Sequence, residues 1–141
     1  MVKRFLGGAA LAAIVVLGAP LAVHAGSLNP DMLLLISTFQ KGAGVKAFSA
    51  EDGKKLFNSK RTHSQKNEER SCTTCHTADP SKQGKTVVGK VIEPISPAVT
   101  KERFTNPKKV EKWFKRNCEW VLERECTSKE KGDFITYMMS L

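Results

Sequence analysis

The sequence lacks the patterns that mark a strand-rich fold, a repeat protein or a nucleic-acid groove. No stretch alternates apolar and polar residues as a half-buried β-strand does, and beyond the N-terminal region there is no internal repeat or low-complexity segment. The basic residues are not interleaved with aromatic or glycine residues, which argues against nucleic acid as a partner. Cysteines are limited to four. These absences favour an all-α protein.

The only long apolar run, 5–21, lies at the N-terminus. It follows Lys3 and Arg4 and precedes Val23-His24-Ala25, which has the small-x-small pattern of a cleavage site. Residues 1–25 are therefore predicted to be a secretory signal peptide, and the mature protein is expected in the periplasm. An uncleaved anchor is the alternative, although glycines and a proline make the run short for a membrane span.

The five residues Cys72-Thr73-Thr74-Cys75-His76 form C-x-x-C-H, the attachment signature of a c-type haem. Thiols three positions apart share one face of a helical turn, where both can bond to the vinyl groups of one porphyrin. The following His can bind the iron as the proximal ligand. A dithiol redox motif would normally open a helix in a βαβ pattern, and a zinc site would need another ligand pair closer than Cys118 and Cys126. The sequence predicts one covalently attached haem c.

Export also bears on the remaining cysteines and on the charge. In an oxidising compartment Cys118 and Cys126 are expected to form a disulfide, with two free buried thiols as the alternative. Without the signal peptide the chain keeps 21 basic and 14 acidic residues, a net charge of +7. A basic surface of this kind would attract an acidic redox partner or an anionic membrane. The alternative is that the lysines only keep the protein soluble.

Four helix starts are visible after the signal peptide. Their N-cap residues are Asn29, Ser49, Asn106 and Thr127. The last forms a capping box with Glu130. Gly53 and Gly132 are expected to allow close approach of other elements. The first helix is interpreted as an N-terminal extension, 26–46, packed on a cytochrome body, 47–141.

Two segments carry no helical pattern. Residues 58–70 are polar and charged and are interpreted as a surface loop leading into the haem motif. Residues 77–100 hold several glycines and prolines and are expected to line a haem pocket irregularly. The apolar lining would come from Val91, Ile92 and Ile95.

The residue opposite His76 decides between an electron carrier and a gas-binding protein. The methionines outside the signal peptide are Met32, Met138 and Met139, and periodicity makes Met138 a core residue. His63 lies in the charged segment and is expected to be a solvated surface His.

An open site, a water or Asn117 remain as further alternatives. Asn117 falls on the same helical face as Trp113 and Phe114, so its amide is expected to point the way these rings point. An amide on such a face often only caps a backbone group. As an iron ligand, its neutral oxygen would suit Fe(III) and hold Fe(II) poorly.

Several motifs resemble the sphaeroides haem protein family, over about residues 47–141. They are Cys72-Thr-Thr-Cys-His76, Gly89-Lys90-x-Ile92-x-Pro94, Arg103-Phe104-Thr105, Val110-Glu111-Lys112-Trp113, Arg116-Asn117-Cys118 and Arg124-x-Cys126-Thr127. The resemblance implies a class I cytochrome c-like fold with an extra N-terminal helix and a disulfide-closed loop. The chain departs from the family in Trp120 and in the strong charge of the segment before the haem motif.

The resemblance also implies roles for individual residues. His76 would be the proximal ligand and Asn117 the distal ligand of the oxidised protein, with a Cys118–Cys126 disulfide. Asn117 would leave on reduction, and O₂, NO or CO would bind. The implied electron donors are a dihaem cytochrome c and a membrane cytochrome b.

Two other functions remain open. The alternative to a gas-binding protein is an ordinary low-spin electron-transfer cytochrome c with a closed His/Met or His/His iron. An enzyme that reduces oxygen or NO would need a proton donor, but the Asn117 face carries no carboxylate or His, and no catalytic residue is assigned. Arg103 and Lys90 are candidate partners of the haem propionates.

Overall fold

The computed structural model describes residues 27–141, so the predicted signal peptide lies outside the described residues. The elements, in chain order, are α1 (Pro30–Ala43), α2 (Ala50–Asn58), β1 (Arg61–Thr62), β2 (Glu69–Arg70), α3 (Thr73–His76), β3 (Gly84–Lys85), β4 (Val91–Ile92), α4 (Pro107–Leu122) and α5 (Ser128–Met139). Helices dominate, and the all-α prediction is confirmed. Over 27–141 every helix is too short or too polar to cross a membrane.

Four of the helices begin where the sequence predicts. The N-cap side chains of Asn29, Ser49, Asn106 and Thr127 each accept a hydrogen bond from the first turn of their helix. At Thr127 both halves of the capping box form with Glu130. These bonds satisfy amide groups that would otherwise lack partners at a helix start. Local sequence therefore determines these four helix starts.

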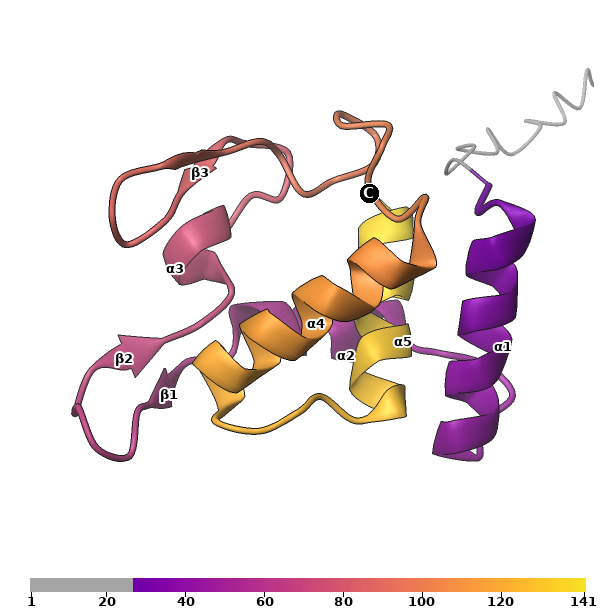
Figure 1. The fold of residues 1–141 in the computed structure, drawn as a ribbon, viewed down its shortest axis with the longest axis horizontal. Helices are drawn as coiled ribbons and strands as arrows, with labels where there is room; N and C mark the ends of the chain where they lie inside the picture. Colours follow the sequence, from indigo (N-terminus) through magenta and orange to yellow (C-terminus); the bar gives the residue numbers. More distant parts are fainter. Residues whose placement is uncertain (1–26) are drawn as a thin grey trace, which may run out of the picture.

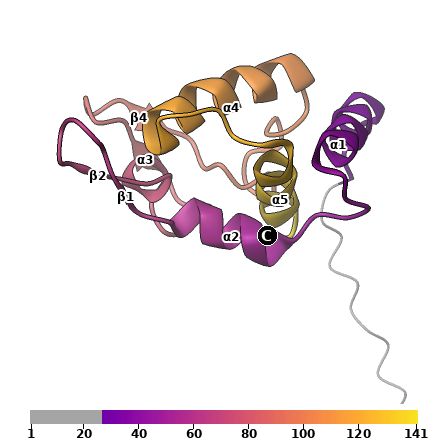
Figure 2. The same cartoon turned by 90° about the horizontal axis from the view of Figure 1, so that it is seen from below.

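The helices stack around α5, which lies between α2 and α4 (Figure 2). Gly53 permits a close approach of α2 to α5, because an added Cβ would lie 2.1 Å from the carbonyl oxygen of Asp133 on α5. Gly132 instead accommodates an aromatic side chain, since its Cβ would lie 2.2 Å from the ring of Phe48. The helix α1 packs on α5 at the end of the molecule opposite α3 (Figure 1).

An aromatic cluster forms the core where these helices meet. The rings of Phe114 and Phe134 pack edge to face with centroids 5.6 Å apart, and Phe39 meets Phe114 at 6.4 Å. Phe57 joins from α2, 6.2 Å from Phe134. Edge-to-face packing of buried rings adds to the hydrophobic stabilisation of the core. Four helices distant in sequence are held together by these contacts.

Two short antiparallel ladders were not predicted. Strands β1 and β2 pair with Arg61 opposite Arg70, so most of the segment predicted as a loop, residues 61–70, is a hairpin. Strands β3 and β4 pair Gly84 with Ile92 inside the segment after the haem motif. Two-residue strands leave no periodic apolar pattern for sequence analysis to detect.

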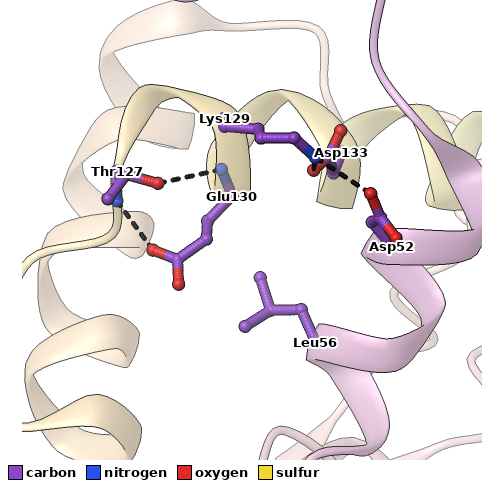
Figure 3. A pocket seen from close by; sticks show the side chains of 6 residues that line it. All are labelled: Asp52, Leu56, Thr127, Lys129, Glu130 and Asp133. Carbon is purple, nitrogen blue, oxygen red and sulfur yellow. Dashed lines mark hydrogen bonds and ion pairs between the residues drawn. The ribbon is translucent and has the colours of Figure 1, made fainter. Parts of the chain in front are cut away.

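The start of α5 borders a polar hollow of about 270 Å³, shown in Figure 3. Lys129 bridges Asp52 of α2 and Asp133 of α5 with Nζ–oxygen distances of 2.9 and 2.6 Å. Asp133 is buried and also accepts from the amide of Ser49 at 2.8 Å. The hollow contains none of the predicted site residues, and its charged groups fasten α2 to α5.

Acid should weaken the start of α5 through Glu130. Hydrogen bonds, first from Arg124 and then from Thr127, hold the pKa of Glu130 at about 2, below its usual value of 4.5. The carboxylate therefore stabilises the fold fully above pH 4.5, and this stabilisation is lost as the pH falls toward 2. Urea unfolding at several pH values should show Glu130→Gln with a shallower decline in this window than wild type. Equal slopes for wild type, Glu130→Gln and the control Glu125→Gln would contradict it.

Candidate functional site

The residues Cys72 to His76 form a single helical turn, as predicted. The amide of His76 donates to the carbonyl oxygen of Cys72 at 3.0 Å. Ser71 and Thr74 exchange hydrogen bonds, the amide of each donating to the hydroxyl oxygen of the other at 3.0 and 3.2 Å. This reciprocal bond caps the turn at its start. Cys72 and Cys75 are both free and partly buried.

Burial shifts the pKa values of Cys72 and His76 toward their neutral forms. It raises the pKa of the Cys72 thiol to about 11. Burial first, and then the positive charge of Arg103, lowers the pKa of His76 to about 4. At pH 7 His76 is therefore an uncharged imidazole, the form whose nitrogen lone pair can bind a metal.

The motif is supported from the side by Gly84 of β3. A Cβ on Gly84 would lie 1.8 Å from the carbonyl oxygen of Cys75, so only glycine fits. Arg103 donates from Nε to the carbonyl oxygen of Pro94 at 2.9 Å and from an Nη to that of Glu93. Two of its five N–H groups are used in this way. It holds the loop after β4 while its charge acts on His76.

Asn117 lies on α4, apart from the motif. Within residues 27–141 α3 packs against β3, with little direct contact with α4. Asn117 is exposed on the face that carries Trp113, whose side chain is 43% exposed, while Phe114 is buried against α5. The expectation that Asn117 points the same way as both rings is therefore half wrong. Consecutive helical residues differ by about 100°, so one ring entered the core and the other did not.

The other candidate ligands are held elsewhere. Met32 and Met138 are fully buried in the core cluster. The prediction that His63 is a solvated surface residue is wrong. Its side chain is only 14% exposed, and its Nε2 lies 3.5 Å from Glu123. Its Nδ1 accepts from the amide of Gln65 at 3.2 Å. His63 is therefore held between Gln65 and the end of α4.

The predicted disulfide between Cys118 and Cys126 is present, with Cα atoms 5.5 Å apart. Helix α4 continues through Cys118 to Leu122, so half of the closed loop is helical. By the chain-entropy model a loop of this length stabilises the fold by on the order of 2–3 kcal/mol. The bond fastens the last turn of α4, which follows Asn117 directly.

The site fits a covalently attached porphyrin. Two free thiols and a neutral imidazole share one turn. Apolar side chains between 43% and 86% exposed lie around β4, in the loop after it and on α4: Val87, Val88, Val91, Val99 and Trp113. A flat apolar ring can cover such surface. Of the predicted lining residues, Ile95 packs on the core and Ile92 is half-buried, whereas Val91 is exposed.

Sequence reasoning missed three positions around the motif. In the sequence Gly84 is only one of the glycines and prolines that break regular structure in residues 77–100, although the motif cannot pack without it. Arg70 of the hairpin binds Trp120 of α4, and Glu123 at the end of α4 binds Ser64 of the hairpin. Only the charge of the segment before Cys72 indicated contacts of this kind.

Residues 27–141 hold no group of three or more His, Cys, Asp and Glu suited to a metal ion.

The chain matches a family model described as a domain of unknown function, DUF1924, over residues 43–138. It is 43% identical to the cytochrome c-type protein SHP of Cereibacter sphaeroides over 114 residues, 81% of this chain and 85% of that protein. It is also 43% identical to cytochrome c'' of Methylophilus methylotrophus over 94 residues, 65% of this chain and 64% of that protein.

Solved structures agree. Oxidised SHP, described as an oxygen-binding cytochrome c, matches with a TM-score of 0.72 and 40% identity, covering 82% of this chain and 100% of that one. The crystal structure of oxidised cytochrome c'' has a TM-score of 0.67 at 34% identity, covering 77% and 92%. Its solution structure, described in terms of haem-ligand detachment, has a TM-score of 0.67 at 33% identity, covering 79% and 94%. The chain belongs to the SHP and cytochrome c'' family of c-type cytochromes.

Proposed function

We propose that this protein is an exported monohaem cytochrome c that binds a diatomic gas when reduced. Cys72 and Cys75 would attach the haem, His76 would be one ligand of the iron, and Asn117 would be a second ligand in the oxidised protein. The observation that carries the proposal is the turn with two free thiols and a neutral imidazole, in a chain 43% identical to SHP. The structure of SHP is described as that of an oxygen-binding cytochrome c.

Haem c, when bound, supplies a one-electron redox centre and an iron coordination position for O₂, NO or CO. Asn117 controls access to that position. Its amide oxygen is a weak, hard donor that favours Fe(III) over Fe(II), so Asn117 leaves on reduction. The description of ligand detachment in cytochrome c'' supports a ligand that moves in this family. The exposure of Asn117 on α4 also supports its release on reduction, because no core packing holds the side chain in place.

Electrons come from an acidic redox partner, for which a dihaem cytochrome c linked to a membrane cytochrome b remains our proposal. The supporting feature is the surface of α4. Its exposed basic residues are Lys108, Lys109, Lys112, Lys115 and Arg116. Such a row of like charges attracts a partner of opposite charge and orients its approach.

Export to the periplasm is part of the proposal. The signal-peptide pattern of residues 1–25 suggests it, and the Cys118–Cys126 disulfide supports it, since structural disulfides persist mainly in oxidising compartments. Edman or mass-spectrometric analysis of the protein purified from the periplasm should give Gly26 as the first residue.

The experiment that tests gas binding is the optical spectrum of the purified holoprotein in the ferric, ferrous and ferrous CO-treated states. We expect a high-spin ferrous spectrum that shifts on addition of CO. A low-spin ferrous spectrum indifferent to CO would overturn the proposal. The protein would then be an ordinary electron carrier, closed by another residue such as Met138 or His63.

A further inference from the structure

The hairpin before the haem motif touches the far end of α4. Arg70, the last residue of β2, precedes the motif by two positions and is only 6% exposed. Its guanidinium lies 4.7 Å from the centroid of the Trp120 ring, and an Nη donates to the carbonyl oxygen of Trp120 at 3.0 Å. A planar guanidinium can stack on a ring and bond to a carbonyl at the same time. Arg70 therefore holds both the side chain and the backbone of Trp120.

The charge of Arg70 is balanced within the hairpin. Its Nε donates to a carboxylate oxygen of Glu68 at 3.0 Å, and an Nη also bonds to that oxygen. Arg70 lowers the pKa of Glu68, which therefore remains ionised at neutral pH. A buried cation without such a partner would strongly destabilise the fold. The pair fixes the direction of the guanidinium toward α4.

A second contact lies one turn further on. Glu123 directly follows α4 and has a left-handed backbone, with φ of 54°, where glycine is usual. Its carboxylate accepts from the amide and the hydroxyl of Ser64 at 2.9 and 2.6 Å. Both bonds lower the pKa of Glu123 and keep it charged at neutral pH. Contacts from the hairpin tip thus hold this unusual helix end.

Asn117 and Trp120 are three residues apart, so their side chains project from adjacent turns on one side of α4. Arg70, which contacts that side of α4, lies only two positions before Cys72 in the chain. The disulfide holds the other side of the same turn. Since α3 itself has little contact with α4, the hairpin links the motif to the Asn117 turn through Arg70 at Trp120 and through His63 and Ser64 at Glu123.

We propose that this hairpin, residues 61–70, is a clamp that sets how firmly Asn117 is held over the iron in the oxidised protein, with Arg70 as its positioning residue. The inference rests on the proposed role of Asn117. Without the clamp the end of α4 is held only by the disulfide and the buried Val121, and it loosens. Asn117 then competes less well with an added ligand. In the ferrous protein Asn117 has already left, so the clamp has no effect on gas affinity there.

The test compares ligand affinities of the holoprotein in two oxidation states. For Arg70→Gln we expect the ferric protein to bind imidazole about tenfold more tightly than wild type, with CO affinity of the ferrous protein changed less than twofold. Trp120→Phe keeps a ring under the guanidinium and the backbone carbonyl, and should behave close to wild type. Amide hydrogen exchange at 119–123 should quicken in ferric Arg70→Gln, while exchange at 107–111 stays unchanged.

The matched control is Glu69→Gln. It breaks the exposed ion pair between Lys60 and Glu69 on the same hairpin, 2.8 Å long, which does not touch α4. Its imidazole and CO affinities should equal those of wild type. If Arg70→Gln fails to fold, Glu123→Ala removes the carboxylate that binds Ser64 and faces His63, leaves Arg70 in place, and should still raise ferric imidazole affinity about threefold.

The outcomes separate this inference from the proposed function. If Asn117→Ala leaves ferric imidazole affinity unchanged, Asn117 is not the ligand and both ideas fail. If Asn117→Ala raises it but Arg70→Gln and Glu123→Ala do not, only the clamp is wrong. Equal gains in the ferric and ferrous states of Arg70→Gln would also overturn the clamp, because the change would then act on the pocket as a whole.

Discussion

Replacement of Asn117 by alanine should raise the affinity of the ferric protein for imidazole by about two orders of magnitude. An internal ligand lowers the apparent affinity for an added one in proportion to the fraction of protein in which it has left. If that fraction is about 1% in the ferric state, removal of the amide releases a factor of about 100. Equilibrium titration of the ferric Soret band measures this directly.

The same substitution should leave CO binding to the ferrous protein within twofold of wild type, because Asn117 is then already displaced. A matched control is Asn58→Ala. Asn58 is likewise an exposed amide near a helix end, and its side chain donates only to the carbonyl oxygen of Lys54. Ferric spectra of Asn117→Ala that coincide with wild type, together with unchanged imidazole affinity, would exclude Asn117 as the ligand.

Gly84→Ala should destabilise the fold by about 3 kcal/mol and reduce haem attachment. The added Cβ would lie 1.8 Å from the carbonyl oxygen of Cys75 and 3.1 Å from the Cα of His76. Both neighbours are backbone atoms of the motif, which cannot turn aside as the end of a flexible side chain can. The motif must therefore shift, and with it the spacing of both thiols and the imidazole.

The control for this prediction is Gly53→Ala, whose Cβ would meet the carbonyl oxygen of Asp133 at 2.1 Å. Both variants should unfold at lower denaturant concentration. Only Gly84→Ala should also lower the ratio of covalently bound haem to protein, measured on denatured, extracted samples. A normal haem ratio in Gly84→Ala would show that the motif tolerates the displacement.

Much of the architecture was predictable because its determinants are local. The N-caps at Asn29, Ser49, Asn106 and Thr127 each act over three residues of chain, and all four are confirmed. The spacing of Cys72, Cys75 and His76 predicts one helical turn, which the structure contains. The domain boundary at residue 46 and the iron-binding role of Asn117 stay predictions.

Other features depended on partners far away in sequence. His63 looked like a solvated surface residue because its neighbours are Lys60, Arg61 and Lys66, yet it is held against Glu123, sixty positions later. Trp113 and Phe114 looked equivalent by periodicity, but only Phe114 entered the core. Hydrophobic periodicity assigns a helix face to within about a quarter turn, and packing decides which neighbour is buried.

The sequence by itself determined the helix starts and the attachment turn, since these follow from short-range hydrogen bonding and from the spacing of Cys72, Cys75 and His76. It also predicted the pairing of Cys118 with Cys126, because these two cysteines remain in a chain that carries a signal-peptide pattern. Tertiary structure alone decided the relation between the motif and α4. That relation depends on Arg70 meeting Trp120 and on Ser64 meeting Glu123, contacts that span 50 and 59 residues. The physical reason is that a charged hairpin has no apolar pattern of its own, so its conformation is set by the groups it binds once the chain has folded.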